Sequence, residues 1–277
     1  MADVPSILLN NGVEMPQLGF GVFLVPPDEV VDPVRAALDA GYRLIDTATL
    51  YGNEEGVGRA IADCDVPRDE IFVTTKVWNS DHGYDRTLQA FDHSLKLLGL
   101  ETLDLYLIHW PTPARDLYVD TWRALERIYG DGRARAIGVS NFHVPHLERV
   151  LTEGTVVPAI NQVELHPGLP QDDLRAFNER HAITTEAWSP LGRGAGLLDR
   201  DSVRAIASSH GKSPAQVVLR WHIQLGIVAI PKSVRAERIR ENIDILDFEL
   251  TRDEMALLSA LDGPGRVGPD PDTMNRA

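Results

Sequence analysis

Residues 103–140 read LDLYLIHWPTPARDLYVDTWRALERIYGDGRARAIGVS, and this stretch decides the fold. It begins with a nearly continuous apolar run, Leu103–His109, and ends with another, Ala134–Ser140. Such runs are typical of strands buried on both faces in a parallel sheet. The segment 118–129 between them repeats apolar side chains at helical spacing. We therefore predict a strand, a helix and a second, parallel strand.

The same alternation extends in both directions along the chain. Six further runs of the same kind flank the central unit: Leu18–Phe23, Tyr42–Asp46, Ile71–Lys76, Ala159–Glu164, Ile183–Trp188 and Ile227–Pro231. Helical patterns lie between them, including 28–40, 85–98, 171–181 and 214–224. Eight strands alternating with helices over roughly 250 residues predict an α/β fold, the (β/α)8 TIM barrel. A doubly wound open sheet more often has five or six strands, so the count favours the barrel. The eight repeats take up the length, and we therefore expect one domain over residues 1–277.

Two additions fall outside the repeat. Ile7–Leu9 and Val13–Met15 flank Asn11-Gly12 and predict an N-terminal β-hairpin with a tight turn, placed to plug the bottom of the barrel. Thr251–Leu261 predicts an extra C-terminal helix, with Thr251 as N-cap and Glu254 completing a capping box. The tail Gly263–Ala277 is rich in Pro, Gly and Asp and is expected to be irregular, too short for a second domain or an extended lid.

The composition excludes several classes of partner and site. The 277 residues carry a net charge of −14, which argues against nucleic acid or an anionic membrane as a partner. Cys64 is the only cysteine, so neither an intramolecular disulfide nor a cysteine zinc site is expected. His143 and His146 have no obvious third ligand, and we predict no metal site. No signal peptide or membrane span is visible, so we expect a cytoplasmic protein.

Chemistry in such barrels is done at the C-terminal ends of the strands. Polar or reactive residues end or follow most of the predicted strands: Asp46, Lys76, His109, Ser140, Asn141, Gln162, Glu164, Glu186, Trp188 and Lys232. Polar residues close many strands simply because loops contact water. The pattern over successive strands is harder to explain in that way.

Asp46, Tyr51 and Lys76 suggest a tuned proton donor. A free Tyr has a pKa of about 10, and a nearby ammonium lowers it while a carboxylate orients the ammonium. The alternative is a surface salt bridge between Asp46 and Lys76, with Tyr51 as packing. His109, in the run LYLIHWP, is a candidate donor to a carbonyl oxygen or a structural histidine.

A basic cluster follows the last strand. Lys232, Arg235, Arg238 and Arg240 crowd into nine positions of an acidic chain, and Ser233 is a candidate cap at a helix start. A loop followed by a helix N-terminus at this place is the usual phosphate site of barrel enzymes. The alternative is a solvated helix with ion pairs such as Glu237–Arg240 and Glu241–Arg238. Gly192, Gly194 and Gly196 form either a pyrophosphate cradle or a turn.

The ordered motifs resemble those of the aldo-keto reductases over essentially the whole chain. They are Asp46-Thr47-Ala48 with Tyr51-Gly52-Asn53-Glu54, Thr75-Lys76, Leu105–Pro111, Ile137–Phe142, Asn161–Pro167 and Ile230–Ser233. Within that family the chain is most similar to the bacterial 2,5-diketo-D-gluconic acid reductases, through Gly21–Phe23, Val77–Asn79, Glu186–Gly192 and Lys232–Asn242.

The resemblance implies NADPH-dependent reduction of an aldehyde, ketone or keto acid, with 2,5-diketo-D-gluconate as one candidate. It implies a catalytic tetrad with Tyr51 as general acid, Lys76 as the group that tunes its pKa, Asp46 as the partner of Lys76, and His109 as the group orienting the carbonyl. The implied cofactor contacts are Gly21, Val22, Ser140, Asn141, Gln162, Trp188, Ser189, Leu191, Lys232, Ser233, Val234, Arg238, Glu241 and Asn242. Phe23, Trp78 and Trp110 would wall the substrate pocket beside His109.

The chain departs from the family pattern at Thr49, which stands where Ala is more common and is expected to put a hydroxyl beside Tyr51. Trp188 is a Tyr in many mammalian relatives, and the tail is shorter than in relatives whose tail closes the substrate pocket. Two other functions stay open, a non-catalytic NADPH-sensing regulatory protein and a barrel enzyme acting on phosphorylated sugars. The expected partner is a small carbonyl substrate, and the expected state is a monomer.

Overall fold

Eight parallel strands form the centre of the structure, a computed structural model that describes residues 4–261 and 265–276. Each strand pairs with the next along the chain. The strands are β3 (Phe20–Gly21), β4 (Leu44–Asp46), β5 (Phe72–Val77), β6 (Leu103–Ile108), β7 (Ala134–Ser140), β8 (Ile160–Glu164), β9 (Thr184–Trp188) and β10 (Val228–Ala229). All eight predicted strands are confirmed, and the predicted bounds exceed the observed ones most clearly at β3, β4 and β10.

The sheet closes on itself where β10 meets the segment before β3. Leu18 forms an isolated parallel bridge with Ala229. Gly19 N donates to Ala229 O at 2.9 Å, and Ala229 N donates to Gln17 O at 3.0 Å. The closure explains why β3 and β10 are short, because they meet through single bridges rather than a continuous ladder.

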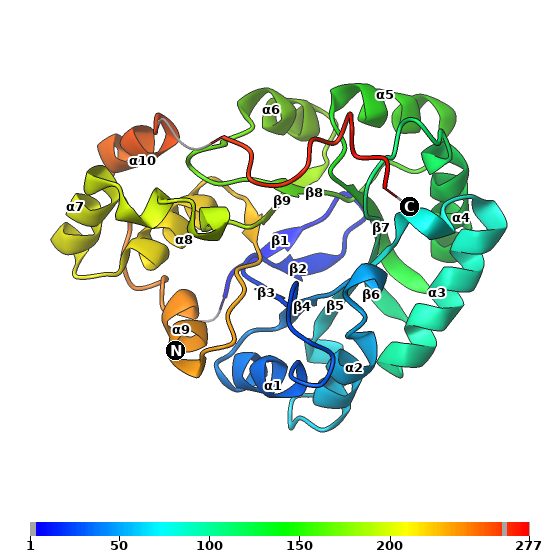
Figure 1. Ribbon diagram of the computed structural model, residues 1–277, viewed down its shortest axis with the longest axis horizontal. Coiled ribbons are helices and arrows are strands. Elements are labelled where there is room, and N and C mark those ends of the chain that lie inside the picture. The colour runs from blue at the N-terminus through cyan, green and yellow to red at the C-terminus, as the bar shows by residue number, and fades with distance from the viewer. Residues whose placement is uncertain (1–3, 262–264, 277) are drawn as a thin grey trace.

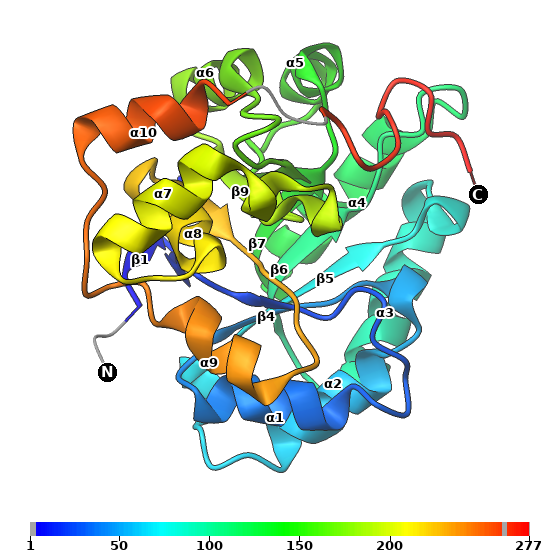
Figure 2. The same ribbon diagram turned by 60° about the vertical axis from the view of Figure 1, so that its left-hand side comes forward.

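Helices surround the strands (Figure 1). They are α1 (Val31–Asp39), α2 (Glu54–Ala62), α3 (Tyr84–Leu98), α4 (Tyr118–Gly130), α5 (Val144–Glu153), α6 (Asp172–Arg180), α7 (Asp201–His210), α8 (Pro214–Gln224), α9 (Ala236–Ile243) and α10 (Arg252–Ser259). The predicted caps of the last helices are confirmed, since Ser213 caps α8 and Thr251 forms a capping box with Glu254 on α10. The helices α2, α5 and α7 were not predicted from the sequence. Of these, α7 breaks the rule of one helix per strand and lies beside α8 (Figure 2).

The N-terminal hairpin, β1 (Ser6–Leu8) and β2 (Glu14–Pro16), packs into one end of the barrel. Leu9 and Met15 are buried in the same cluster as Leu44 and Phe72 from early positions of the barrel strands, so the predicted plug is present. The predicted tight turn is wrong in one respect. Leu9 N donates to Val13 O at 2.9 Å, which leaves a three-residue loop whose Gly12 has a φ of +83°.

Two apolar layers hold the barrel together. The larger lies between the strands and the helices, and the smaller fills the barrel interior below the strand ends. The strands β5 and β6 are buried at every position, and most of the residues of β6 are accordingly apolar. Within the described residues, none of the helices is both long and apolar enough to cross a membrane.

Candidate active site

A cavity of about 410 Å³ opens where the barrel strands end. Most of the residues predicted for the site line it: Gly21, Phe23, Asp46, Tyr51, Trp78, His109, Trp110, Ser140, Asn141, Gln162, Trp188, Ser189, Leu191 and Lys232. Residues separated by up to 211 positions thus meet in one place, as expected for the mouth of a (β/α)8 barrel.

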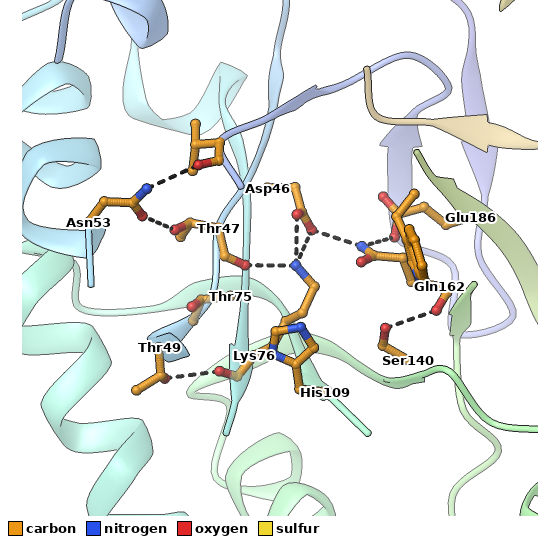
Figure 3. A network of polar contacts seen from close by, with 12 residues as sticks. Asp46, Thr47, Thr49, Asn53, Thr75, Lys76, His109, Ser140, Gln162 and Glu186 are labelled. Atoms are coloured by element: carbon orange, nitrogen blue, oxygen red, sulfur yellow. Dashed lines mark hydrogen bonds and ion pairs between the residues drawn. The ribbon is translucent and has the colours of Figure 1, made fainter. Parts of the chain in front are cut away.

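Lys76 and Asp46 form a buried ion pair at the floor of the cavity (Figure 3). Lys76 Nζ donates to both carboxylate oxygens of Asp46, at 2.7 and 2.8 Å, and to Thr47 O at 2.8 Å. All three ammonium protons therefore have acceptors. Burial alone would lower the pKa of Lys76, but the carboxylate of Asp46 raises it above its ordinary value. A surface salt bridge, the alternative open from the sequence, is therefore wrong.

Tyr51 lies over this ion pair, on the short helical turn Thr49–Tyr51. Lys76 Nζ is 5.3 Å from the centre of its ring. The sequence predicted a lowered Tyr51 pKa, whereas burial raises it to about 12, against the lowering effect of Lys76. The direction differs because desolvation of the phenolate exceeds the attraction of one ammonium that Asp46 already neutralises.

His109 follows β6 and faces Tyr51 across the cavity, with 5.7 Å between the ring centres. Trp78 packs edge-on against it at 5.2 Å, and Phe23 lies 5.0 Å from the Tyr51 ring. Burial, with help from Lys76, lowers the pKa of His109 well below its ordinary value, so the imidazole is neutral. A neutral imidazole carries one N–H and can donate one hydrogen bond to a carbonyl oxygen.

The hydroxyl of Thr49 turns away from the cavity. Its Oγ1 donates to Lys76 O at 2.9 Å and lies 3.3 Å from Ser94 Oγ. The expectation that Thr49 places a hydroxyl beside Tyr51 is therefore wrong. The side chain instead ties the turn that carries Tyr51 to strand β5.

Ser140, Asn141, Gln162 and Trp188 form one hydrogen-bonded wall of the cavity. Asn141 has a φ of +63° and donates from Nδ2 to His109 O at 2.9 Å. Trp188 Nε1 donates to Asn141 Oδ1 at 2.8 Å, and Ser140 Oγ donates to Gln162 O at 2.9 Å. The indole of Trp188 is thereby fixed in orientation while remaining only partly buried.

The basic cluster begins at Lys232, which lines the edge of the cavity. The helix begins at Ala236 rather than at Ser233, whose Oγ instead accepts from Arg235 N at 3.1 Å. Within residues 4–261 and 265–276, none of the four cations between 232 and 240 forms an ion pair. The predicted alternative of helical pairs with Glu237 and Glu241 is therefore wrong, and the cations remain available to an anion.

Some predicted site residues do not line the cavity. They are Val22, Lys76, Ser233, Val234, Arg238, Glu241 and Asn242. Lys76 is fully buried below the floor of the cavity. Val22 is also fully buried, and its N–H donates to Asp46 O at 3.1 Å. Arg238 is exposed on α9, six residues after Lys232.

The C-terminal tail contributes cavity residues that were not predicted from the sequence. It has no helix or strand over 265–276, as predicted, yet Pro269, Met274 and Arg276 line the cavity. Asn79 Nδ2 donates to Arg276 O at 2.7 Å, and the tail passes over the end of the barrel (Figure 1). Residues 263, 264 and 277 lie outside the described residues. No periodicity marks such a segment, so its irregular character could be predicted from composition but its contacts with the cavity could not.

Glu164, at the end of β8, holds the start of the tail. Its carboxylate accepts from Val267 N at 2.6 Å and from Gly268 N at 2.9 Å. A Cβ at Gly268 would lie 2.4 Å from Trp188 Cη2, so only glycine lets the backbone pass this closely over the indole.

The tail also brings Asp270 and Asp272 to His143. One carboxylate oxygen of each Asp and one ring nitrogen of His143 lie within 4.8 Å of one another. These carboxylates were not visible as partners of the His143–His146 pair. His143 Nδ1 already lies 2.9 Å from Asp272 Oδ1, and the Arg266 guanidinium approaches Nε2 at 3.3 Å. This group therefore joins the tail to α5, and we propose no metal for it.

Comparison with known proteins identifies the architecture and the site together. Residues 17–262 match the Aldo/keto reductase family. The chain belongs to this family. The resemblance seen in its motifs is confirmed, and each family motif supplies one part of the cavity wall or floor described above.

Related aldo/keto reductases carry names that describe carbonyl reduction. The chain is 53% identical to the glyoxal reductase of Bacillus subtilis over 270 residues, 97% of each chain. It is 48% identical to the methylglyoxal reductase DkgA of Escherichia coli over 273 residues, 98% of each chain. A crystal structure of a mutant of Gox0644 in complex with NADPH is 48% identical, with a TM-score of 0.93, covering 97% of this chain and 98% of that one.

This aldo/keto reductase is an NADPH-dependent oxidoreductase that reduces carbonyl groups. The residues present fit NADPH. Unpaired cations lie beside the cavity, the partly buried indole of Trp188 offers a flat apolar face, and Gly21 leaves room where a Cβ would lie 3.2 Å from Ile230 O. The names of these relatives give no support to the regulatory alternative.

Proposed function

We propose that Tyr51 is the general acid of carbonyl reduction, with Lys76, Asp46 and His109 supporting it. The observation that carries this proposal is the position of the buried Lys76 ammonium, which is saturated by Asp46 and Thr47 and lies 5.3 Å from the Tyr51 ring. NADPH supplies a hydride to the carbonyl carbon when bound.

Each residue then has a separate task. Tyr51 Oη gives its proton to the carbonyl oxygen, on which negative charge develops, and regains one from water. Lys76 stabilises the phenolate that Tyr51 becomes, and Asp46 keeps Lys76 charged and in place. Neutral His109 donates its N–H to the carbonyl oxygen and so fixes the direction of the carbonyl group.

For the cofactor, we propose that Gln162, Ser140 and Asn141 surround the nicotinamide amide and that Trp188 stacks on its ring. Gly21, Val22, Ser189 and Leu191 would lie along the nicotinamide and pyrophosphate. Lys232, Ser233, Val234 and Arg238 would hold the 2′-phosphate, with Glu241 and Asn242 at the adenine. The unpaired cations of this segment support the phosphate assignment.

The substrate we propose is a small 1,2-dicarbonyl compound such as glyoxal or methylglyoxal. The cavity of about 410 Å³ must hold the nicotinamide as well as the substrate, which favours a small molecule. Its aromatic walls, Phe23, Trp78 and Trp110, offer few polar partners to a longer polyol chain. The names of the relatives agree with this choice.

A second candidate is 2,5-diketo-D-gluconate, and one observation favours it. The Arg276 side chain lines the cavity beside residues of the substrate end, and it forms no ion pair within the described residues. A guanidinium at this point suits a substrate that carries a carboxylate.

The test is to follow NADPH absorbance with the purified protein and a panel of glyoxal, methylglyoxal and 2,5-diketo-D-gluconate. We expect turnover of all three, with kcat/KM highest for methylglyoxal. A tenfold preference for the keto acid would reverse the order of the two candidates. Absence of turnover with every carbonyl would overturn the catalytic assignment. We also propose a monomer in the cytoplasm, which light scattering after gel filtration and cell fractionation would check.

A further inference from the structure

Glu186 is a buried carboxyl group at the active site that the proposed mechanism does not use. It lies in the middle of β9, is fully buried, and is aligned with Gln162 on β8 and Val228 on β10. Its Oε2 accepts from Gln162 Nε2 at 2.9 Å. Its Oε1 is also buried and has no hydrogen-bond partner among the described residues. A buried carboxyl with only one partner is costly, so its presence needs a reason.

Gln162 links Glu186 to the Asp46–Lys76 pair. Its Nε2 donates to Asp46 Oδ2 at 2.8 Å as well as to Glu186 (Figure 3). Both hydrogens of the primary amide are therefore used, one on each carboxyl group. A flipped amide would place Gln162 Oε1 against the carboxylate oxygen of Asp46, and the contact of Nε2 with Glu186 Oε2 would be lost as well. Asp46 and Glu186 together therefore fix the orientation of the amide.

The other end of the amide is left for a ligand. Gln162 lines the cavity, and its Oε1 makes no hydrogen bond within the described residues. With Nε2 held at the floor, Oε1 is the atom that can accept a hydrogen bond from a group in the cavity. A primary carboxamide is such a donor.

The charge of Glu186 fits this task. Asp46 and Lys76 already neutralise each other, so a second ionised carboxyl would leave a net negative charge in the barrel interior. Burial, together with the nearby Asp46, raises the pKa of Glu186 to about 8. Near neutral pH the group therefore holds a proton, and its other oxygen accepts from Gln162 without disturbing the charge balance around Tyr51 and Lys76.

We propose that Glu186 is a positioning residue for the cofactor: with Asp46 it clamps the Gln162 amide so that Oε1 accepts from the nicotinamide carboxamide. Glu186 itself does not touch the cofactor. The inference rests on the proposed role of Gln162, and it adds a residue to which the family resemblance gave no role.

The experiment compares two ligands by isothermal titration calorimetry: NADP+, and 2′-phospho-ADP-ribose, which lacks the nicotinamide. Glu186→Leu is expected to weaken NADP+ binding about 3- to 10-fold, the effect of one ordinary hydrogen bond, and to leave 2′-phospho-ADP-ribose binding unchanged. Glu186→Gln is expected to bind NADP+ as tightly as the wild type does, because the amide oxygen of the new side chain can still accept from Gln162. If E186L does not fold, Glu186→Ala carries the same expectation.

Gln162→Leu separates this inference from the proposed function. It should weaken NADP+ binding as E186L does, and the double variant should show no further loss, because the two residues act through one contact. If Q162L weakens NADP+ binding and E186L does not, the role of Glu186 is overturned while that of Gln162 stands. If Q162L has no effect, the proposed role of Gln162 fails and the inference with it.

Thr74→Val is the matched control. Thr74 also lies in the barrel and is fully buried, and its Oγ1 likewise has no partner among the described residues. The variant should bind both ligands as the wild type does. An equal loss for NADP+ and 2′-phospho-ADP-ribose in E186L would indicate general damage to the barrel and would contradict a specific role in positioning.

Discussion

At the scale of single residues, the proposed chemistry depends on the phenolic proton of Tyr51. Replacing Tyr51 by Phe removes that proton and keeps the ring that packs on Phe23. We expect kcat for methylglyoxal reduction to fall about 10²- to 10⁴-fold, the usual contribution of a general acid, while NADPH binding is unchanged. Steady-state kinetics and NADPH titration by protein fluorescence measure the two quantities.

Tyr84→Phe is the control for this prediction, because Tyr84 is 41% exposed on α3 and does not line the cavity. This substitution also removes a phenolic hydroxyl, but one outside the cavity, and should leave kcat unchanged. Turnover by Y51F within tenfold of the wild type would contradict the assignment of Tyr51 as the acid.

The positions of the reactive residues could be predicted from the sequence, but their charge states could not. Asp46, Lys76 and His109 end apolar runs, and a barrel brings such ends together. The pKa of a group depends on how deeply it is buried and on what faces it, which one strand does not reveal. Tyr51 and Glu186 therefore have raised pKa values that only the assembled barrel explains.

At the scale of elements, the segment from Lys232 through α9 is the proposed 2′-phosphate site. Arg238 and Arg240 are two positions apart on α9, so they point about 200° apart around its axis and cannot both reach one phosphate. We expect Arg238→Ala to raise the Kd for NADPH about 10- to 100-fold and to leave the Kd for NADH within about twofold. Arg240→Ala should change neither. Equal losses for NADPH and NADH in R238A would count against a phosphate contact.

The tail is the second element with a function of its own. Arg276 is exposed at the rim of the cavity, so its attraction for a substrate carboxylate is partly screened by water. We expect Arg276→Ala to lower kcat/KM for 2,5-diketo-D-gluconate about fivefold and to leave methylglyoxal unchanged. Arg252→Ala, on the exposed side of α10, should affect neither substrate. A similar loss for both substrates in R276A would show that the side chain shapes the cavity rather than attracts an anion.

Elements differed in how well the sequence predicted them. The long buried strands and the capped helices α8 and α10 were predicted because their signals are local. The position of the tail over the cavity and the helix α7 were not predicted, because each is held by distant groups: Glu164 fixes the tail at Val267 and Gly268, and α7 packs on α8. Contacts of this kind leave no mark in the spacing of residues.

At the scale of the whole molecule, neutral histidines buried in the native state make its stability depend on pH. Burial lowers the pKa of His82 to about 3 and that of His222 to about 4. In the unfolded chain both have a pKa of about 6.5. Between these values the unfolded state binds a proton that the native state does not, so stability falls as the pH drops below about 6.5 and is fully present above it.

His82→Gln should therefore reduce the pH dependence of unfolding. Each buried histidine lowers the free energy of unfolding by roughly 2 kcal/mol between about pH 7.5 and about pH 5, and the variant should lack one such contribution. Urea denaturation at the two pH values measures the difference, and comparing slopes removes any uniform effect of the substitution. His93→Gln, at an exposed position of α3, should match the wild type. His82 Nδ1 lies 3.1 Å from Thr112 Oγ1 in the buried native state. Identical pH dependence in H82Q and the wild type would contradict a neutral His82 imidazole at this position.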